Sequence, residues 1–215
     1  MDYSSIEMEQ YLSSHIDPES DLLYRLDRQT HLRTIQPRML SGHLQGAIMK
    51  MIVRMVNPRL VLEIGTFTGY SALAMAEGLL RDDAHIHTIE IDDEMEPLIS
   101  EFFAQSPHAS QLTLHIGDAM SVIDDIPGVF DLVFLDGEKR TYPETYEKVF
   151  PRVAHGGFIL VDNVLWDGHV LEQVHKPSDR HTASIKRFND MVAADPRVEK
   201  VILPVRDGLS LIRKI

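Results

Sequence analysis

The chain has 215 residues, enough to bury one substantial α/β core, and it contains no cysteine, which excludes a disulfide framework and a thiol nucleophile. Asp and Glu total 33 against 21 Lys and Arg, a net charge of −12 that disfavours nonspecific binding to nucleic acid or anionic membranes. The sequence shows neither a signal-peptide pattern nor an apolar run near the length of about 20 residues that spans a bilayer, so we expect a cytoplasmic protein.

The region before Pro58 predicts helices and no buried strand. Its clearest pattern is LQGAIMKMIVRMV at 44–56, where apolar residues recur at helical spacing. We expect residues 1–57 to form a helical cap segment that flanks or covers a binding site. Residues 58–215 then form an α/β core, and the two parts together make a single domain over 1–215.

The next segment, VLEIGTFTGY at 61–70, predicts a buried strand that ends in a glycine turn, and SALAMAEGLL then predicts a helix. A strand, a glycine turn and a helix N-terminus together bind polar ligands well. Gly65 and Gly69 enclose three residues with side chains, whereas a dinucleotide fingerprint needs a middle glycine close to the pyrophosphate. A pyrophosphate ligand is therefore disfavoured, and an ordinary strand-to-helix turn is the alternative.

A second strand is predicted at 85–92, HIHTIEID, which alternates in polarity and ends in acids. An acid at the tip of the second strand can accept hydrogen bonds from both hydroxyls of a ribose, and Glu90 is placed for this role. A solvated strand end is the alternative interpretation of the same residue.

The rest of the chain alternates between short apolar runs and helical patterns, which predicts a parallel, doubly wound sheet. Asp207-Gly208 lies between two further β-rich runs and indicates a hairpin, so we expect an antiparallel pair to close the sheet. The predicted strands after the second one are LTLHIGDA at 112–119, FDLVFLDG at 130–137, GGFILVDN at 156–163, and the two runs VEKVILPV and LSLIRKI.

Three oxygen-bearing side chains follow two of these strands. Asp136 ends one strand, Asp162 and Asn163 end the next, and all three meet if the strands are neighbours, since their carboxyl ends share one edge. Two carboxylates and an amide oxygen suit Mg²⁺ or Ca²⁺. Lys139, three residues after Asp136, is a candidate general base. A helix N-cap is the alternative role for Asp136, and a solvated lysine is the alternative for Lys139.

The motifs EIGTFTGYS, TIEID, GDAM, FLDGEKRTY and LVDNVLW, in this order and spacing, resemble the cation-dependent O-methyltransferase family that includes catechol and caffeoyl-CoA O-methyltransferases. The resemblance covers roughly residues 35–215, and the ending DPRVEKVILPVRDGLSLIRK is similar to the bacterial branch. It implies the Rossmann-like fold of class I S-adenosylmethionine (SAM) methyltransferases. In that fold a mostly parallel seven-stranded sheet carries an antiparallel C-terminal hairpin strand and N-terminal flanking helices.

The resemblance also implies roles for individual residues. Asp136, Asp162 and Asn163 would be the metal ligands, and Lys139 would be the base that removes a hydroxyl proton beside Asp136. Asp118 would meet the adenine, although an acid in a strand-end turn is the alternative. The implied cofactor contacts are Ser41, Glu63, Gly65, Tyr70, Ser71, Glu90, Asp118, Ala119 and Asp136.

One motif departs from the family pattern. Asp136-Gly137-Glu138-Lys139 stands where relatives usually carry an Ala-Asp pair between the ligand and the lysine. Glycine allows a looser loop, and glutamate carries its carboxylate about one methylene further out. We expect metal affinity and metal choice to be the properties that this departure affects.

The function implied by the resemblance is transfer of a methyl group from SAM to a hydroxyl of a vicinal dihydroxy aromatic small molecule. The implied cation is Mg²⁺, with Ca²⁺ or Mn²⁺ as alternatives, and the implied assembly is a homodimer. A tRNA 5-hydroxyuridine O-methyltransferase uses the same chemistry, and the acidic net charge disfavours it. A nicotinamide-dependent oxidoreductase and a non-catalytic SAM-binding module are further alternatives, which the glycine spacing and the complete set of site residues disfavour.

Overall fold

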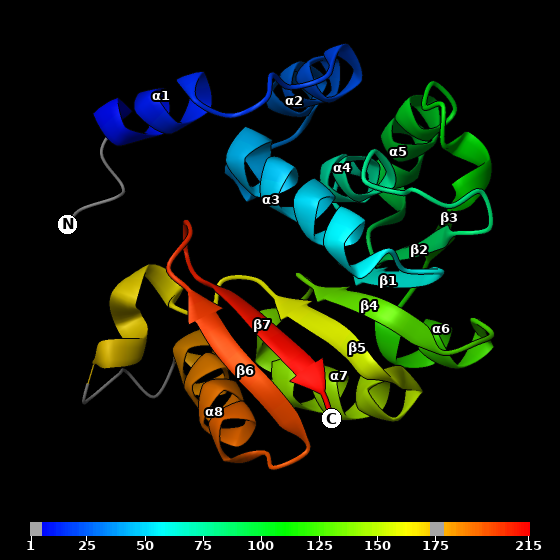
Figure 1. Cartoon of the computed structure of the whole chain (residues 1–215). Helices are drawn as coiled ribbons and strands as arrows, with labels where there is room; N and C mark the ends of the chain where they lie inside the picture. Colours follow the sequence, from blue (N-terminus) through cyan, green and yellow to red (C-terminus); the bar gives the residue numbers. More distant parts are fainter. Residues whose placement is uncertain (1–5, 173–178) are drawn as a thin grey trace.

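The computed structural model describes residues 6–172 and 179–215, and a seven-stranded sheet runs through them (Figure 1). Its strands are ordered β3-β2-β1-β4-β5-β7-β6. Strands β1 to β5 pair in parallel, and β7 is antiparallel to both of its neighbours, β5 and β6. The strands are β1 Leu60–Ile64, β2 His85–Glu90, β3 Leu112–Ile116, β4 Phe130–Leu135, β5 Val153–Val161, β6 Val198–Leu203 and β7 Leu209–Lys214.

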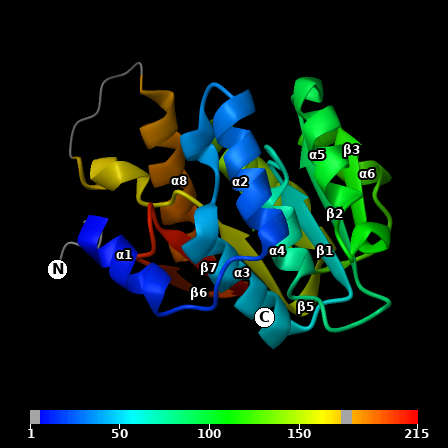
Figure 2. The ribbon, with the colours of Figure 1, turned by 90° about the horizontal axis from the view of Figure 1, so that it is seen from above.

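Helices cover both faces of the sheet, with α2 to α5 on one face and α6 to α8 on the other (Figure 1). Figure 2 shows α2, α3 and α4 lying over the sheet, with α1 set to one side. Because side chains alternate along a strand, Val61 joins the core under α2 to α5 and Leu62 joins the core under α6 to α8. The helices are α1 Ile6–Ser14, α2 Asp21–Arg33, α3 Gly42–Val56, α4 Tyr70–Ala76, α5 Glu96–Phe103, α6 Ala119–Asp125, α7 Tyr142–Val149 and α8 Arg180–Ala194; short 3₁₀ turns include η1 Pro37–Met39, η4 Lys139–Thr141 and η6 Trp166–Leu171.

The predicted strand segments extend past the observed strand ends, and two of these ends have a clear local cause, whereas β5 begins at Val153, three residues before its predicted start. The strand expected at 85–92 ends at Glu90, whose side chain accepts the backbone N–H of Asp92 and so turns the chain away from the sheet. The strand expected at 112–119 ends at Ile116, because Gly117 has a φ of 147° and Asp118 already caps α6. In both places a polar cap or a glycine stops the strand before the apolar pattern stops.

The register of the sheet aligns the ends of β1, β4 and β5. Ile64 pairs with Leu135, and Leu135 pairs with Val161. The ladder then continues for one more residue: the N–H of Asp136 donates to the carbonyl of Ile64 (2.8 Å), and the N–H of Asp162 donates to the carbonyl of Leu135 (3.0 Å). The two acids therefore leave adjacent strands at the same level of the sheet.

The architecture confirms the fold expected from the sequence, a mostly parallel seven-stranded sheet closed by an antiparallel hairpin and flanked by N-terminal helices. The strand order reverses direction between β1 and β4, the point at which open α/β sheets bind their ligands. Within the described ranges no helix is both long enough and apolar enough to cross a membrane.

Candidate active site

Asp136 and Lys139 form a largely buried ion pair at the end of β4. Lys139 Nζ donates to Asp136 Oδ1 at 2.7 Å and to the Asp136 carbonyl at 3.3 Å. Burial raises the pKa of Asp136 to about 6, the Lys139 ammonium opposes this rise, and the nearby carboxylate of Asp162 adds to it. Asp136 is not a helix N-cap, because Glu138 caps η4 by accepting the N–H of Arg140.

Asp162 and Asn163 lie beside this pair, in a network of specific hydrogen bonds. Asp162 Oδ2 accepts from Gln45 Nε2 of α3 at 2.7 Å, and Oδ1 accepts from the backbone N–H of Asn163 at 2.8 Å. Asn163 Nδ2 donates to Asp207 Oδ2 at 3.3 Å, which turns its amide nitrogen away and keeps its oxygen available. The buried Tyr142 hydroxyl donates to the Asp162 carbonyl at 3.1 Å, so the main chain is also held.

The donor chemistry of this cluster fits a hard divalent cation. The carboxylate of Asp162 adds to the rise in the pKa of Asp136, and a bound cation would relieve that repulsion. Each oxygen of Asp162 accepts one of the hydrogen bonds described above and keeps a second lone pair. No group of three or more His, Cys, Asp or Glu side chains in the described residues is arranged to hold a metal ion, so the set depends on two carboxylates and the Asn163 amide.

The glycine turn after β1 packs directly against the Asp136 backbone. Gly65 has a φ of 97°, and a Cβ at this position would lie 2.5 Å from the carbonyl oxygen of Asp136. Gly69 has a φ of 90°, and a Cβ there would lie 2.8 Å from the ring of Phe103. Both positions therefore require glycine, both for the backbone conformation and for the close approach. Gly137 is less demanding, because a Cβ there would meet a side-chain methyl of Ile64 at 3.1 Å.

A small cavity of about 10 Å³ lies above this turn, with room for about one water molecule. It brings together five of the residues expected to contact the cofactor, namely Ser41, Gly65, Tyr70, Ser71 and Asp136. Its remaining lining residues are Met39, Leu40, Thr66, Phe67 and Thr68. The other expected site residues lie outside this lining: Glu63, Glu90, Asp118, Ala119, Lys139, Asp162 and Asn163.

Glu63 is completely buried in β1 beneath the turn. Burial raises its pKa to about 8, and the neighbouring hydroxyls of Ser71 and Thr88 oppose that rise. Thr88 Oγ1 donates to Glu63 Oε2 at 2.5 Å, whereas Oε1 has no hydrogen-bond partner within the part of the chain that the structure describes. An ionised Glu63 is therefore costly in the absence of a ligand.

The acids after β2 and β3 are bonded to backbone N–H groups. Glu90 is buried, which raises its pKa, and its carboxylate accepts the N–H groups of Phe67 (2.7 Å) and Asp92 (2.9 Å). Asp118 is exposed and caps α6 by accepting the N–H of Met120 at 3.1 Å. This cap is the alternative role that the sequence left open for Asp118, and Ala119 is the first residue of the same helix.

Sequence reasoning missed three residues of the site, Gln45, Arg206 and Asp207. Gln45 is buried between Asp162 and Arg206, whose guanidinium donates to Gln45 Oε1 at 3.0 Å. Arg206 and Asp207 belong to the Arg-Asp-Gly turn between β6 and β7, which the sequence identified as a hairpin and not as part of a site. Nothing in the local sequence marks Gln45, because its importance comes only from contacts across the fold.

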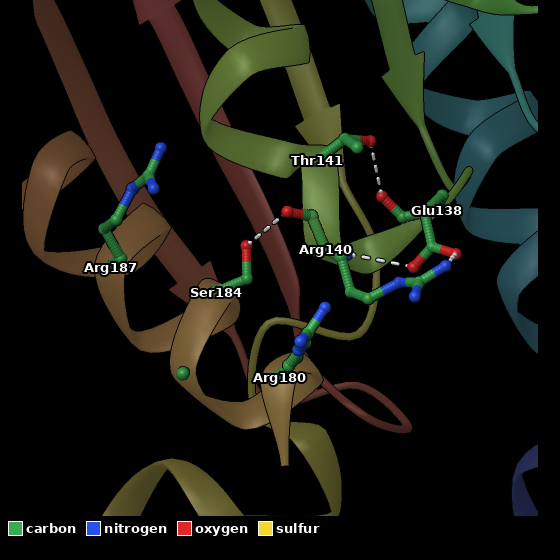
Figure 3. Close-up of a pocket in the computed structure, with 7 residues that line it drawn as sticks. Glu138, Arg140, Thr141, Arg180, Ser184 and Arg187 are labelled. Carbon is green, nitrogen blue, oxygen red and sulfur yellow. Dashed lines mark hydrogen bonds and ion pairs between the residues drawn. The ribbon is translucent and has the colours of Figure 1, made fainter. Parts of the chain in front are cut away.

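A larger groove, of about 520 Å³, lies between η4 and α8 (Figure 3). Arg140 and Arg187 line it, and each is paired with a glutamate: Arg140 with Glu138 at 2.7 Å, and Arg187 with Glu144. Two of its lining residues, Glu138 and Arg140, flank Lys139 in the sequence, so the groove adjoins the ion pair of Asp136 and Lys139. Its lining residues are Glu138, Arg140, Thr141, Arg180, Ala183, Ser184 and Arg187.

Comparison with known proteins identifies relatives over most of the chain. A family model described as O-methyltransferase matches residues 11–215. Caffeoyl-CoA O-methyltransferase 1 of Eucalyptus globulus is 33% identical over 180 residues, which cover 80% of this chain and 73% of that protein. Caffeoyl-CoA O-methyltransferase 2 of Petunia hybrida is 30% identical over 223 residues, with 92% of each protein covered.

Solved structures agree with these sequence matches. The S-adenosylhomocysteine (SAH)-bound methyltransferase PaMTH1 of Podospora anserina matches with a TM-score of 0.87 at 28% identity, covering 97% of this chain and 94% of that one. The O-methyltransferase TomG of Streptomyces achromogenes, solved in complex with SAM, matches with a TM-score of 0.89 at 26% identity, covering 97% of this chain and 96% of that one.

Proposed function

Because this chain belongs to the O-methyltransferase family and is a SAM-dependent enzyme, we propose that it methylates a hydroxyl of a catechol-like small molecule with the help of a divalent cation. The observation that carries this proposal is the meeting of Asp136, Lys139 and Asp162 at the ends of adjacent strands. The names of the plant relatives specify a caffeoyl group, which carries two neighbouring phenolic hydroxyls, and this supports a phenolic acceptor.

In this proposal the lining residues of the small cavity above the glycine turn move apart, and the cofactor occupies the space that this opens. Gly65 allows its close approach, and Ser41, Tyr70 and Ser71 surround it. Glu90 would accept the ribose hydroxyls once its carboxylate exchanges backbone partners for them. Asp118 and Ala119 would lie beside the adenine, and Glu63 would lie beneath the amino-acid end of the cofactor.

Asp136, Asp162 and Asn163 would hold the cation, with Mg²⁺ as our first choice and Ca²⁺ or Mn²⁺ as alternatives. The carboxylates supply negative charge and Asn163 supplies a neutral oxygen, which Asp207 orients by binding the amide nitrogen. A bound cation would lower the pKa of the acceptor hydroxyl and fix the orientation of its oxygen.

The residues of the chain account for the remaining steps. The Lys139 ammonium would first lose its proton to solvent, and the neutral amine would then take the hydroxyl proton at Nζ, which lies against Asp136 in the ligand-free chain. SAM would supply the methyl group, which would pass to the acceptor oxygen as the bond from carbon to sulfur breaks and leaves its electron pair on sulfur. The sulfonium becomes the neutral thioether of SAH, so no covalent intermediate with the protein is needed.

The test is transfer of labelled methyl from SAM to catechol, with Mg²⁺ and then with EDTA. We expect turnover with Mg²⁺, loss of turnover with EDTA, and loss of turnover in Asp162→Ala. Asp83→Ala, which removes an exposed carboxylate, is the matched control and should keep full activity. Equal turnover with and without EDTA would contradict the cation proposal, and no methylation of any catechol would contradict the acceptor proposal.

The groove of Figure 3 supports a second candidate, methylation of 5-hydroxyuridine in tRNA. Three arginines line it beside Lys139 on a chain whose net charge is −12, and arginine is a natural partner of phosphate. Arg180 is the most informative of them, because Arg140 and Arg187 are already paired with glutamates.

The same labelled-SAM assay distinguishes the two candidates. If tRNA is the acceptor, hydroxyuridine-containing tRNA is labelled, and Arg180→Gln reduces this labelling while leaving the methylation of catechol unchanged. If the acceptor is a small diol, the tRNA stays unlabelled, which would rule out the second candidate.

We also propose a homodimer. Large apolar side chains on and after α2 are exposed to solvent, namely Tyr24 (57%), Leu32 (69%) and Ile35 (99%), and a second copy could cover them. Size-exclusion chromatography with light scattering should give twice the mass of the 24.5 kDa chain. A monomer at micromolar concentration would contradict this proposal.

A further inference from the structure

The turn between β6 and β7 is bonded to the N-terminal part of the chain through one side chain. The guanidinium of Arg206 donates through Nη1 to the carbonyl of Ser41, and through Nη2 to the carbonyl of Leu40 at 3.1 Å. Nη1 also donates to Gln45 Oε1 at 3.0 Å. One arginine therefore joins the hairpin to the start of α3, although the residues lie far apart in the sequence.

The backbone of Arg206 adopts a conformation that is unfavourable for a residue with a side chain. Its φ is 49°, in the left-handed region that non-glycine residues rarely adopt. A strained backbone of this kind persists only where surrounding contacts fix it. Asp207 fixes the other side of the turn, by accepting the N–H of Asp167 at 2.6 Å and the amide of Asn163 at 3.3 Å.

The contact with Gln45 extends the effect of Arg206 to a proposed metal ligand. Gln45 Nε2 donates to Asp162 while Gln45 Oε1 accepts from Arg206, so the two neighbours define which way the amide points. The reversed amide would place its oxygen against the Asp162 carboxylate and its NH₂ group against the guanidinium. Arg206 therefore fixes the orientation that allows Gln45 to support Asp162.

The covering segment, which we define as residues 39–41, forms one side of the cofactor cavity. The opposite side is formed by the glycine turn after β1 and by the start of α4, which the sheet and the packing of the core hold in place. Because the cavity has room for about one water molecule, the cofactor enters or leaves only when lining residues move. The covering segment runs from the last residue of η1 to the residue before α3, and Arg206 bonds it to the hairpin through the carbonyls of Leu40 and Ser41.

We propose that Arg206 is a positioning residue that latches the covering segment over the cofactor, so that release of SAH requires the arginine to leave the two backbone carbonyls. The proposal rests on the SAM-dependent activity, but not on the cation or on the identity of the acceptor. Its main consequence is kinetic: without the latch, the segment opens more often and the cofactor exchanges faster.

The test compares Arg206→Gly, Arg206→Lys and the control Arg213→Gln, which removes an exposed arginine of β7 paired with Glu199. Glycine suits the left-handed backbone, so Arg206→Gly removes the guanidinium while easing the backbone strain. SAH dissociation is measured by stopped-flow displacement, without cation or acceptor. We expect dissociation at least fivefold faster in Arg206→Gly, an intermediate rate in Arg206→Lys, and the wild-type rate in Arg213→Gln. A rate in Arg206→Gly within twofold of wild type would overturn the latch.

Hydrogen exchange provides a second readout that needs no ligand. The amides of residues 39–46 should exchange faster in Arg206→Gly than in the wild type, while the amides of β1 and β4 stay unchanged. Unchanged exchange over 39–46 would overturn the proposal. This readout separates the latch from the proposed function, because faster exchange would support the latch even if catechol is not a substrate.

Discussion

Replacing Glu63 with glutamine should make the ligand-free protein more stable at high pH. The pKa of Glu63 in the folded chain is about 8, because the side chain is buried, against an ordinary value of 4.5. A raised carboxyl pKa stabilises the folded state fully below the ordinary value, and this contribution is lost as the pH rises towards 8. Glutamine cannot ionise, so Glu63→Gln avoids this loss.

The magnitude follows from the size of the pKa change. The step from 4.5 to about 8, at about 1.36 kcal/mol for each unit of pKa, gives an upper limit of roughly 5 kcal/mol at pH 9. At pH 5 the Glu63 carboxyl is neutral in the folded protein and resembles the glutamine amide in shape. Either side chain has one atom, at the position of Oε1, without a hydrogen-bond partner among the described residues. The two proteins should then differ by about 1 kcal/mol or less.

Urea denaturation followed by circular dichroism, at pH 5, 7 and 9, measures the difference directly. The stability advantage of Glu63→Gln over wild type should grow steadily across the series. Glu94→Gln, at an exposed position after β2, is the control and should show no such growth. If the difference between Glu63→Gln and wild type is the same at pH 5 and pH 9, the argument from burial is wrong.

Three further results are expected. Gly65→Ala should lower the free energy of unfolding by about 3 kcal/mol or more, because φ is 97° and the new Cβ would clash with the Asp136 carbonyl. A variant as stable in urea as the wild type would contradict this expectation. Tyr142→Phe should lower the free energy of unfolding by about 1 kcal/mol through loss of the buried hydrogen bond to the Asp162 carbonyl, and an unchanged urea midpoint would show that this bond contributes nothing. EDTA should abolish turnover while calorimetry still detects SAH binding, and loss of both would mean that the cation also holds the cofactor.

The sequence predicted the parts of the molecule that depend on local pattern. Apolar runs located all seven strands, and the Asp207-Gly208 turn indicated the antiparallel hairpin that the structure contains. The sequence also placed Asp136 and Asp162 together on the condition that their strands are neighbours, and the structure pairs β4 with β5 in parallel. These predictions depend on periodicity and on the geometry of parallel sheets, which short stretches of sequence contain.

The sequence could not predict contacts that exist only after folding. Gln45 and Arg206 are separated by most of the chain, and each looks like an ordinary polar residue in its own segment. Strand ends were also overestimated where Glu90 and Asp118 use their side chains to bind nearby N–H groups. The cofactor roles of Glu63, Glu90 and Asp118 remain predictions, and Asp118 occupies a helix cap in the structure.

The position of β7 has a consequence for the synthesis of this protein. This strand lies between β5 and β6, yet it follows both of them in the sequence. While the chain is being translated, β5 therefore keeps an open edge until residues 209–214 have left the ribosome, and β6 has no neighbour to join. The turn that carries Arg206 and Asp207 closes in the same event. The nascent chain thus completes its sheet and the candidate site together, and an unfinished chain presents an exposed strand edge to its surroundings.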